Sequence, residues 1–457
     1  MAERMVVIGA DATGMSAASQ ARRLRGADEL EIVVFEKGRH ASYSACGIPY
    51  WVSGDVPEAD DLIARTPEEH RARAIDLRLR TEVIELDVPG RQVRSRDLDT
   101  GAETWTGYDK LVLATGATPI RPPLPGIDAD GVFGVQTLDD GEDLIEALVS
   151  SSGRDAVVVG AGYIGVEMAE ALIRRGFRVT MVTRGPEPMS TLDPDMGALV
   201  REAMEGMGIR LVTDTEATGM RTDADGHVCA VTTADTEYPA DVVVLGLGVR
   251  PATDLARQAG LPLGESGGLL TDLAQRVRGH DNIWAGGDCV EVLDRVSGTM
   301  RHIALGTHAN KHGQVIGTGI GGGYATFPGV VGTAVSKVCD LEVARTGLLE
   351  QDAERAGLQF HAVTIESTGR AGYFPGAEPM TVKMLAERRS GRLLGVQIVG
   401  REGAAKRVDI AAVALTARMT VEQMTALDLG YAPPFSPVWD PVLVAARAAT
   451  RAVARGD

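Results

Sequence analysis

The sequence predicts an α/β protein with two Rossmann-like domains followed by a C-terminal α+β domain. The first observation is a unit of strand, glycine turn, helix and strand that occurs twice, at residues 5–36 and 156–184. A parallel sheet built from such units binds a dinucleotide at the carboxyl ends of its strands. The second observation is a change of pattern near residue 327, after which alternating stretches such as Val330–Val338 and Thr381–Leu385 predict antiparallel strands.

The first unit carries an incomplete glycine motif. An apolar strand runs into Gly9, and an alanine-rich helix follows Gly14, but Asp11 replaces the middle glycine. The next strand ends at Glu36, an acid that is well placed to bind ribose hydroxyls. A later strand ends in a glycine turn and Asp288. Together these features favour a first dinucleotide site, although Glu36 alone fits an ordinary solvated strand end.

The second unit carries the full motif, Gly160–Gly165, between a strand and a helix. Its glycines allow close approach of a pyrophosphate, and the helix N-terminus supplies free amides and a positive dipole. The next strand ends at Thr183 and Arg184, with no acid to repel a 2′-phosphate. Arg184 can pair with such a phosphate, so NADPH is favoured over NADH, which stays possible. The alternative for Arg184 is a solvent-facing side chain.

Two further apolar strands mark where the chain crosses between the units. The first precedes Ala114-Thr115-Gly116 and a proline-rich stretch at 119–125, and the second, at 241–248, precedes Arg250-Pro251. We therefore expect four segments. They are residues 1–118 and 246–326 for the two parts of the first nucleotide-binding domain, 119–245 for the second, and 327–457 for the C-terminal domain.

Composition limits the partners and the compartment. The 46 basic and 63 acidic residues give a net charge of −17, which disfavours nucleic acid and anionic membranes as partners. Four unpatterned cysteines in 457 residues indicate a reducing compartment, not a disulfide scaffold. A strand begins at Met5 and no apolar run reaches transmembrane length, so we expect a cytoplasmic protein without a signal peptide. We predict no metal site.

Cys46 is the most informative residue, because no second cysteine lies near it in the sequence. A thiol without a resolving partner holds reducing equivalents as a mixed disulfide with an outside thiol, or as a sulfenic acid. The helix start expected after Cys46 would lower the pKa of its thiol. The alternative is a buried structural cysteine, the commoner state of a lone one.

These motifs resemble a known family. The two nucleotide units, the Gly286–Asp288 turn and the lone Cys46 are similar to those of the FAD- and pyridine nucleotide-dependent disulfide oxidoreductases. More narrowly, the chain resembles the single-cysteine branch, which includes coenzyme A-disulfide reductase, persulfide reductase, NADH oxidase and NADH peroxidase. The most specific segments are Ser42–Tyr50, Leu305–Lys311 and Tyr431–Pro437, and the resemblance covers nearly the whole chain.

The resemblance implies an FAD domain interrupted by an NAD(P)H domain, a C-terminal dimerisation domain and a homodimer. It implies FAD contacts from Gly9, Gly14, Glu36, Lys37, Val83, Ala114, Thr115, Gly116, Asp288 and Ala309. It implies nicotinamide nucleotide contacts from Gly160, Gly162, Tyr163, Ile164, Gly165, Arg184 and Gly248.

The resemblance also implies a substrate. Oxidase and peroxidase members carry a histidine three residues after the first motif glycine, and here that position is Ala12, which has no proton to give. The chain therefore looks like a coenzyme A-disulfide reductase: NADPH reduces the disulfide through FAD and a mixed disulfide on Cys46. Tyr373 and Tyr431 would reach the other subunit's cysteine and donate to the departing thiolate; their alternative is interface packing. Substrate contacts would come from Ser16, Gln20, Arg23 and Ser42.

Several alternatives stay open at this stage. Ala45 stands where the similar reductases have asparagine, which leaves room for a persulfide or polysulfide reductase that uses the same thiol. An NAD(P)H oxidase or peroxidase and a reductase of an iron–sulfur protein are further enzymes of this scaffold. Asp11 also permits a non-catalytic binding protein on a decayed flavoprotein scaffold.

Overall fold

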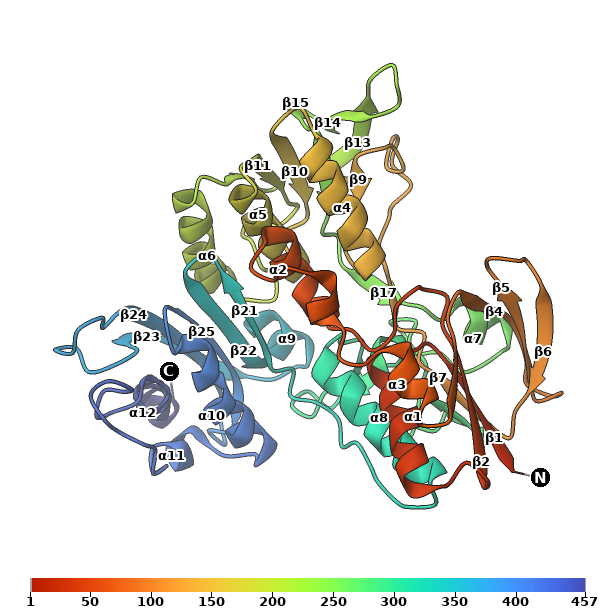
Figure 1. Cartoon of the computed structure of the whole chain (residues 1–457). Coiled ribbons are helices and arrows are strands. Elements are labelled where there is room, and N and C mark those ends of the chain that lie inside the picture. Colours follow the sequence, from red (N-terminus) through yellow and green to blue (C-terminus); the bar gives the residue numbers. More distant parts are fainter. Residues whose placement is uncertain (1, 457) are drawn as a thin grey trace.

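The computed structural model describes residues 2–456 and has three parts, each built on a five-stranded sheet (Figure 1). The first sheet is entirely parallel, in the order β18-β7-β1-β2-β3. Its strands are β1 Glu3–Ile8, β2 Leu30–Phe35, β3 Ile75–Arg78, β7 Lys110–Leu113 and β18 Ile283–Ala285. Parallel strands place their carboxyl ends at one edge, which confirms the first predicted unit.

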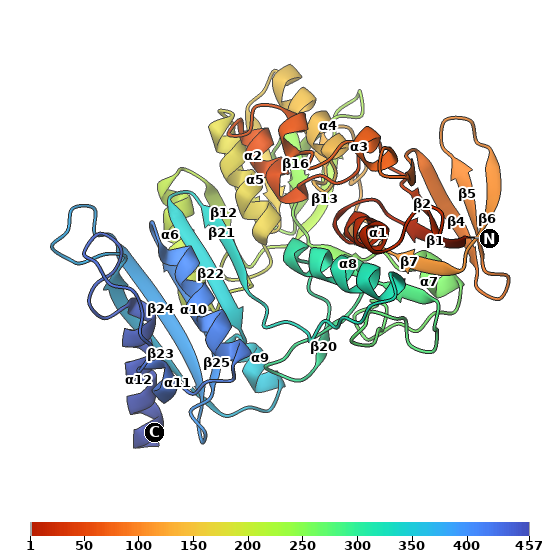
Figure 2. The ribbon, with the colours of Figure 1, turned by 60° about the horizontal axis from the view of Figure 1, so that its bottom comes forward.

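Two helices, α1 (Ala12–Leu24) and α8 (Gly306–Ile320), lie side by side on one face of this sheet (Figures 1 and 2). They approach closely because glycines of α8 face α1: a Cβ built at Gly317 would lie 2.5 Å from the carbonyl oxygen of Ala17. The other face is covered by an antiparallel sheet of β4 Thr81–Asp87, β5 Gln92–Asp97 and β6 Glu103–Gly107. Both faces of the parallel sheet are therefore buried, as its continuous apolar strands require.

The second sheet is also parallel, in the order β12-β11-β10-β16-β9. Its strands are β9 Val132–Phe133, β10 Asp155–Val159, β11 Arg178–Val182, β12 Arg210–Val212 and β16 Val242–Leu245. Helices on its faces are α4 Leu138–Ser150, α5 Tyr163–Arg174 and α6 Pro194–Gly206. A small antiparallel sheet contributes β13 Ala217–Thr222, β14 Val228–Thr233 and β15 Glu237–Pro239. The repeated unit predicted from the sequence is thus present twice.

The two parallel sheets are joined where the sequence predicts crossovers. Strands β8 (Ala117–Pro119) and β17 (Val249–Pro251) pair with each other in antiparallel register. Thr115 reinforces the junction, because its hydroxyl donates to the carbonyl of Ala252 at 2.7 Å. The predicted residue boundaries of the domains stay a proposal.

The third sheet is antiparallel, in the order β21-β22-β25-β24-β23. Its strands are β21 Ala334–Val338, β22 Leu341–Gly347, β23 Phe360–Thr368, β24 Pro379–Glu387 and β25 Leu393–Gly400. The helices of this part are α9 Glu350–Arg355, α10 Ala404–Thr416, α11 Val421–Met424 and α12 Pro441–Arg455. The α+β character expected after residue 327 is therefore confirmed.

The remaining elements are short. They are α2 Ile48–Ser53, α3 Pro67–Arg71, α7 Asp254–Gln258, β19 Val292–Leu293, β20 Met300–Arg301 and the 3-10 turns η1 Ala45–Gly47, η2 Ala59–Leu62 and η3 Gly287–Cys289. Helix α2 packs against α5, so the segment that contains Cys46 lies where the first and second parts meet (Figure 1). Among the described residues, no helix combines the length and hydropathy needed to span a bilayer.

An ion cluster around the buried pair Lys383 and Asp193 joins the second and third parts. Lys383 of β24, whose side chain is only 5% exposed, lies 3.1 Å from Asp193, 2.7 Å from Asp195 and 2.6 Å from Glu350. Gln397 of β25 donates to Asp193 at 2.6 Å. Because Asp193 and Asp195 begin α6, this cluster fixes the position of the second sheet relative to the third.

Candidate active site

The first glycine turn is shaped by close backbone packing. Gly9 has a φ of +101°, and a Cβ there would collide with the carbonyl of Ala114. A Cβ at Gly14 would collide with the carbonyl of Gly9. Both positions therefore require glycine, and the turn leaves the first amides of α1 directed at the carboxyl edge of the sheet.

Glu36 follows β2 and faces this turn. Its carboxylate accepts the amide of Ala10 at 2.8 Å and the amide of Gly38 at 2.7 Å. Each oxygen keeps a further lone pair, so the carboxylate can still accept ribose hydroxyls as predicted. Lys37, the next residue, is exposed.

Asp11, which replaces the middle glycine, lies at the N-cap of α1. The nearby backbone groups of Tyr43 and Ala12 lower the pKa of its carboxyl, but they do not offset the effect of burial. Burial, with smaller contributions from Glu36 and Asp288, raises the pKa of Asp11 from 3.8 to about 6. Unlike an ordinary aspartate, Asp11 is therefore partly protonated near neutral pH.

The remaining residues predicted to contact FAD come from four separate segments. Asp288 lies in η3 directly after β18, and burial raises the pKa of its carboxyl. Ala309 of α8 accepts the hydroxyl of Thr13 at 2.9 Å. Gly116 has a φ of +69°, and Val83 of β4 packs against the core on the far face of the sheet.

These residues fit FAD. Gly9 and Gly14 leave no room for a Cβ and so keep the turn tight, the α1 amides provide donors for a pyrophosphate, and Glu36 provides acceptors for a ribose. Asp11 is the one departure from this arrangement, because a carboxyl with a pKa of about 6 is still mostly ionised at pH 7. Their roles as FAD contacts nevertheless stay predictions.

The second glycine turn repeats this geometry. Gly160 has a φ of +103°, and a Cβ at Gly165 would collide with the carbonyl of Gly160. Gly162 is the N-cap of α5, and no heavy atom lies within 4 Å of a Cβ built there, so space remains for a phosphate. Gly246, which we did not predict as a site residue, packs closely against this turn: a Cβ built at its position would lie 2.9 Å from the Cα of Gly165.

The other residues predicted for the nicotinamide nucleotide lie around this turn. Tyr163 and Ile164 begin α5, and burial raises the pKa of the Tyr163 hydroxyl. Gly248 has a φ of +85° and is exposed. Arg184 follows β11, and its exposed side chain lies 3.7 Å from the carboxylate of Glu216. Such an exposed pair is weak and leaves the guanidinium accessible.

Cys46 lies in η1, directly before α2, with an exposed side chain. The cysteine is therefore not buried, which removes the structural alternative considered above. The expectation of a lowered thiol pKa is wrong: partial desolvation, followed by the charges of Glu167, Asp288 and Asp11, raises the pKa of Cys46. The helix that follows has only six residues, and the lowering of the pKa that its N-terminus would produce does not offset desolvation and the three carboxylates.

Glu167 is a residue that sequence reasoning missed. It lies on α5, and its Oε1 accepts the hydroxyl of Ser336 in β21 at 2.8 Å. Burial raises the pKa of its carboxyl, and its charge also raises the pKa of Tyr50 in α2. Glu167 therefore joins the second part to the third sheet and influences the segment that contains Cys46 and Tyr50, and no local sequence pattern marks it.

The residues predicted to bind substrate divide into two groups. Ser16, Gln20 and Arg23 share one face of α1: Ser16 donates to Asn310 at 2.9 Å, Gln20 donates to Thr318 at 3.2 Å, and Arg23 donates to Gln20 at 3.1 Å. They therefore follow the seam between α1 and α8. Ser42 lies apart from them, in a strained conformation with a φ of +53°.

The hydroxyl of Ser42 lies 2.9 Å from Nε2 of His70, a residue of α3 that is 1% exposed. Burial lowers the pKa of His70 to about 4, so the ring is neutral near pH 7. A hydroxyl bonded to one partner keeps hydrogen-bonding capacity for a second one. Ser42 can therefore still contact a ligand, in an orientation that His70 fixes.

Tyr373 and Tyr431 lie far from Cys46 within the chain, on two exposed loops of the third part. The loops are joined by a hydrogen bond from the amide of Ala371 to the carbonyl of Pro433, 3.0 Å long. The neighbouring side chain of Tyr373 raises the pKa of the Tyr431 hydroxyl. Large apolar side chains are exposed around them, namely Phe435, Val438 and Trp439. Exposed large apolar side chains that follow one another so closely in the chain are typical of a protein interface.

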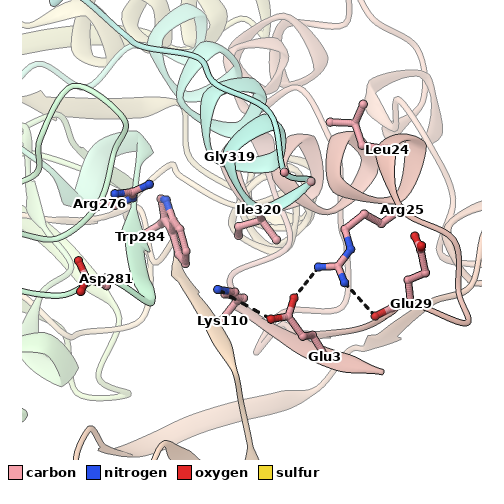
Figure 3. Close-up of a pocket in the computed structure, with 12 residues that line it drawn as sticks. Glu3, Leu24, Arg25, Glu29, Lys110, Arg276, Asp281, Trp284, Gly319 and Ile320 are labelled. Carbon is pink, nitrogen blue, oxygen red and sulfur yellow. Dashed lines mark hydrogen bonds and ion pairs between the residues drawn. The ribbon is translucent and has the colours of Figure 1, made fainter. Parts of the chain in front are cut away.

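A cleft of about 540 Å³ lies away from these residues (Figure 3). It is lined by Glu3, Arg25, Lys110 and Trp284, at the amino ends of β1, β7 and β18 and the ends of α1 and α8. Dinucleotides bind at the opposite, carboxyl edge of such a sheet. The cleft is therefore not the nucleotide site. No group of three or more metal-ligating side chains is found within residues 2–456.

Comparisons with known proteins agree with this geometry. The model of the family "Pyridine nucleotide-disulphide oxidoreductase" matches residues 3–313, and the model of its dimerisation domain matches residues 333–441. A CoA-dependent NAD(P)H sulfur oxidoreductase of Pyrococcus abyssi is 38% identical over 446 residues, covering 97% of both chains. A coenzyme A disulfide reductase of Staphylococcus epidermidis is 28% identical, covering 95% of this chain and 96% of its own.

Solved structures give the same result. Reduced Bacillus anthracis CoADR-RHD superposes with a TM-score of 0.95 at 33% identity, covering 100% of this chain and 81% of its own. An NAD-dependent persulfide reductase from A. fulgidus superposes with a TM-score of 0.94 at 39% identity, covering 98% of this chain and 83% of its own. The chain is thus a flavin-dependent NAD(P)H oxidoreductase, and it belongs to the pyridine nucleotide-disulphide oxidoreductase family.

Proposed function

We propose that this enzyme uses NADPH to reduce a disulfide of low molecular weight, coenzyme A disulfide, through Cys46. The observation that carries the proposal is the exposed Cys46, which lies between the two nucleotide-binding parts without a second cysteine in its segment. The other free cysteines, Cys229, Cys289 and Cys339, lie on other elements, and two of them are buried. A single accessible thiol suits a mixed disulfide with a substrate.

The reaction follows from this thiol. The Cys46 thiolate attacks one sulfur of the substrate, the S–S bond breaks, and the first coenzyme A leaves as a thiolate. When bound, FAD supplies the electron pair that NADPH provides. Cleavage of the Cys46 mixed disulfide by these two electrons releases the second thiolate and restores the Cys46 thiolate. In total, one NADPH and one proton convert one disulfide to two thiols.

Side chains around Cys46 influence where protons are held during this reaction. Partial burial, together with the carboxylates of Glu167, Asp288 and Asp11, raises the pKa of Cys46 and so disfavours its anion between turnovers. A thiolate of higher pKa is also the more nucleophilic one. In a homodimer, the exposed tyrosine pair Tyr373 and Tyr431 would reach the other subunit and donate to the departing thiolate. The apolar surface around this pair supports the dimer.

Arg184 supports the choice of NADPH. Its accessible guanidinium stands where a ribose 2′-phosphate is expected, and its only ion pair among the described residues is the exposed one with Glu216. We expect Arg184→Glu to lower kcat/KM for NADPH about tenfold or more while the value for NADH changes little. Steady-state kinetics with both nucleotides measure this; an unchanged ratio would reject the role.

A persulfide reductase is the second candidate. The Pyrococcus and A. fulgidus relatives named for sulfur or persulfide chemistry are more similar to this chain than the named coenzyme A disulfide reductases of Staphylococcus. Oxidase chemistry is less favoured, because Ala12 offers no proton donor beside the thiol. Anaerobic turnover of coenzyme A disulfide, coenzyme A persulfide and polysulfide by one enzyme preparation decides between them. Preferred reduction of a persulfide over the disulfide would overturn the first proposal.

A further inference from the structure

The turn that carries Asp288 is held by two histidines from two sides. The amide of Gly287 donates to Nδ1 of His312 in α8, at 3.0 Å. The carbonyl of Asp288 lies 2.9 Å from Nε2 of His302, and since a carbonyl only accepts, this nitrogen donates. One histidine therefore accepts from the turn and the other donates to it.

His312 is completely buried, and its ring meets the ring of Phe327 edge-on, with centroids 4.4 Å apart. Because Nδ1 accepts a hydrogen bond, the neutral ring carries its proton on Nε2, which has no hydrogen-bond partner within residues 2–456. Burial lowers the pKa of His312 to about 3, which keeps Nδ1 an acceptor near neutral pH. An apolar side chain would avoid the cost of the unpaired Nε2, so the contribution of this imidazole is its bond to Gly287.

The turn has little freedom in the folded protein. Gly287 has a φ of +78°, and a Cβ there would lie 2.6 Å from the hydroxyl of Thr13 in α1. A Cβ at Gly286 would lie 2.8 Å from the Cβ of His312. The turn is thus wedged between α1 and α8, and this close packing limits the conformations open to it.

We propose that His312 and His302 are positioning residues that hold the Gly286–Cys289 turn in the conformation in which Asp288 binds FAD. The proposal rests on the FAD contact of Asp288 predicted above. A turn whose amide and carbonyl are both bonded before the cofactor binds loses less conformational freedom on binding. The two histidines therefore increase the affinity for FAD without contacting it.

The test measures the rate of FAD release from the purified holoenzyme by flavin fluorescence, together with the visible spectrum of the bound flavin. His312→Leu leaves the Gly287 amide unpaired, and we expect release about tenfold faster, equivalent to about 1.4 kcal/mol. His312→Asn is the rescue variant, because its Oδ1 occupies the position of Nδ1 and can accept the same hydrogen bond. We expect it to restore slow release and the wild-type spectrum.

His308→Leu is the matched control. His308 lies one turn earlier on α8, is 8% exposed and packs against Phe327, but no hydrogen bond joins it to the turn. Its loss should leave FAD release unchanged. Equal acceleration in His308→Leu and His312→Leu, or no rescue by asparagine, would mean that His312 only fills space and would overturn the proposal.

Two further variants complete the design. Asp288→Ala tests the FAD contact itself, and unchanged FAD release from this variant would refute that contact. Faster release from Asp288→Ala together with unchanged release from His312→Leu would refute only the role of the histidine. If His312→Leu does not fold, His302→Ala, at a partly exposed position, gives the same readout. Faster FAD release from His302→Ala supports the proposal, and unchanged FAD release from this variant overturns it.

Discussion

Lys383 offers a sharp test of how the nucleotide-binding part is attached to the C-terminal part. Its ammonium group is the basic member of a cluster with the carboxylates of Asp193, Asp195 and Glu350, at 2.6–3.1 Å. The side chain of Lys383 is 5% exposed and that of Asp193 is 3% exposed. The substitution Lys383→Met keeps the length of the side chain and removes its charge, leaving Asp193 buried without a counter-ion.

The expected cost follows from the desolvation of that carboxylate. Removing one partner of a buried ion pair destabilises a protein by about 3–5 kcal/mol. For a unit of about 150–250 residues, each kcal/mol lowers the Tm by about 2–4 °C, so we expect a decrease of roughly 6–20 °C. The double variant Lys383→Met/Asp193→Asn removes the stranded charge and should recover part of this loss.

Lys406→Met is the matched control. Lys406 pairs with Asp409 at 2.5 Å, but its side chain is 81% exposed, and such surface pairs contribute about 0–0.5 kcal/mol. Thermal unfolding of the three variants, followed by calorimetry, makes the comparison. Equal Tm changes for Lys383→Met and Lys406→Met, or no recovery in the double variant, would refute the reasoning.

Two further predictions concern the first part. Folding raises the pKa of Asp11 from 3.8 to about 6, so the flavin-free protein loses stability as pH rises from about 4 to about 7, by up to about 3 kcal/mol. Urea unfolding should show Asp11→Asn to be more stable than the wild type at pH 8 and equal at pH 4; a pH-independent difference would contradict this. Gly317→Ala should destabilise by about 1–3 kcal/mol, because its Cβ would lie 2.5 Å from the Ala17 carbonyl. Gly319→Ala, whose Cβ meets only Trp284 at 4.0 Å, should stabilise by about 0.5–1 kcal/mol, and equal effects would contradict the packing account.

The fold could be predicted because its signals are local. Each nucleotide unit contains one glycine turn. Gly9 and Gly160 have a positive φ, and a Cβ at Gly14 or Gly165 would collide with the backbone of the same turn, so this geometry is visible in the sequence as a glycine motif. The apolar runs of the parallel strands are equally local. The fold class, the two nucleotide units and the α+β third part are therefore confirmed.

The contacts around the site could not be predicted, because they join distant segments. Ser42 meets His70, Glu167 meets Ser336 169 positions later, and Gly287 meets His312 on another element. No period or motif links such pairs. Sequence reasoning could therefore predict a substrate contact for Ser42, which stays a prediction, but could not identify the histidine that orients it.

The pKa of Cys46 was the clearest error, for the same reason. A helix start is visible in the sequence, whereas the desolvation of the thiol and the charges of Glu167, Asp288 and Asp11, which come from three other segments, depend on the tertiary fold. Electrostatic effects on a thiol depend on all charges within several ångströms, whichever part of the chain they come from. The roles assigned to the individual site residues stay predictions.

The role of Cys46 as the redox thiol is tested most directly by anaerobic turnover of coenzyme A disulfide with NADPH by Cys46→Ser, beside Cys229→Ser. Cys229 is a half-buried free cysteine on β14 and should be dispensable. We predict that Cys46→Ser keeps its FAD and still reduces artificial dyes with NADPH, while disulfide reduction falls to the uncatalysed rate and Cys229→Ser retains wild-type activity. Undiminished disulfide reduction by Cys46→Ser would contradict the thiol mechanism.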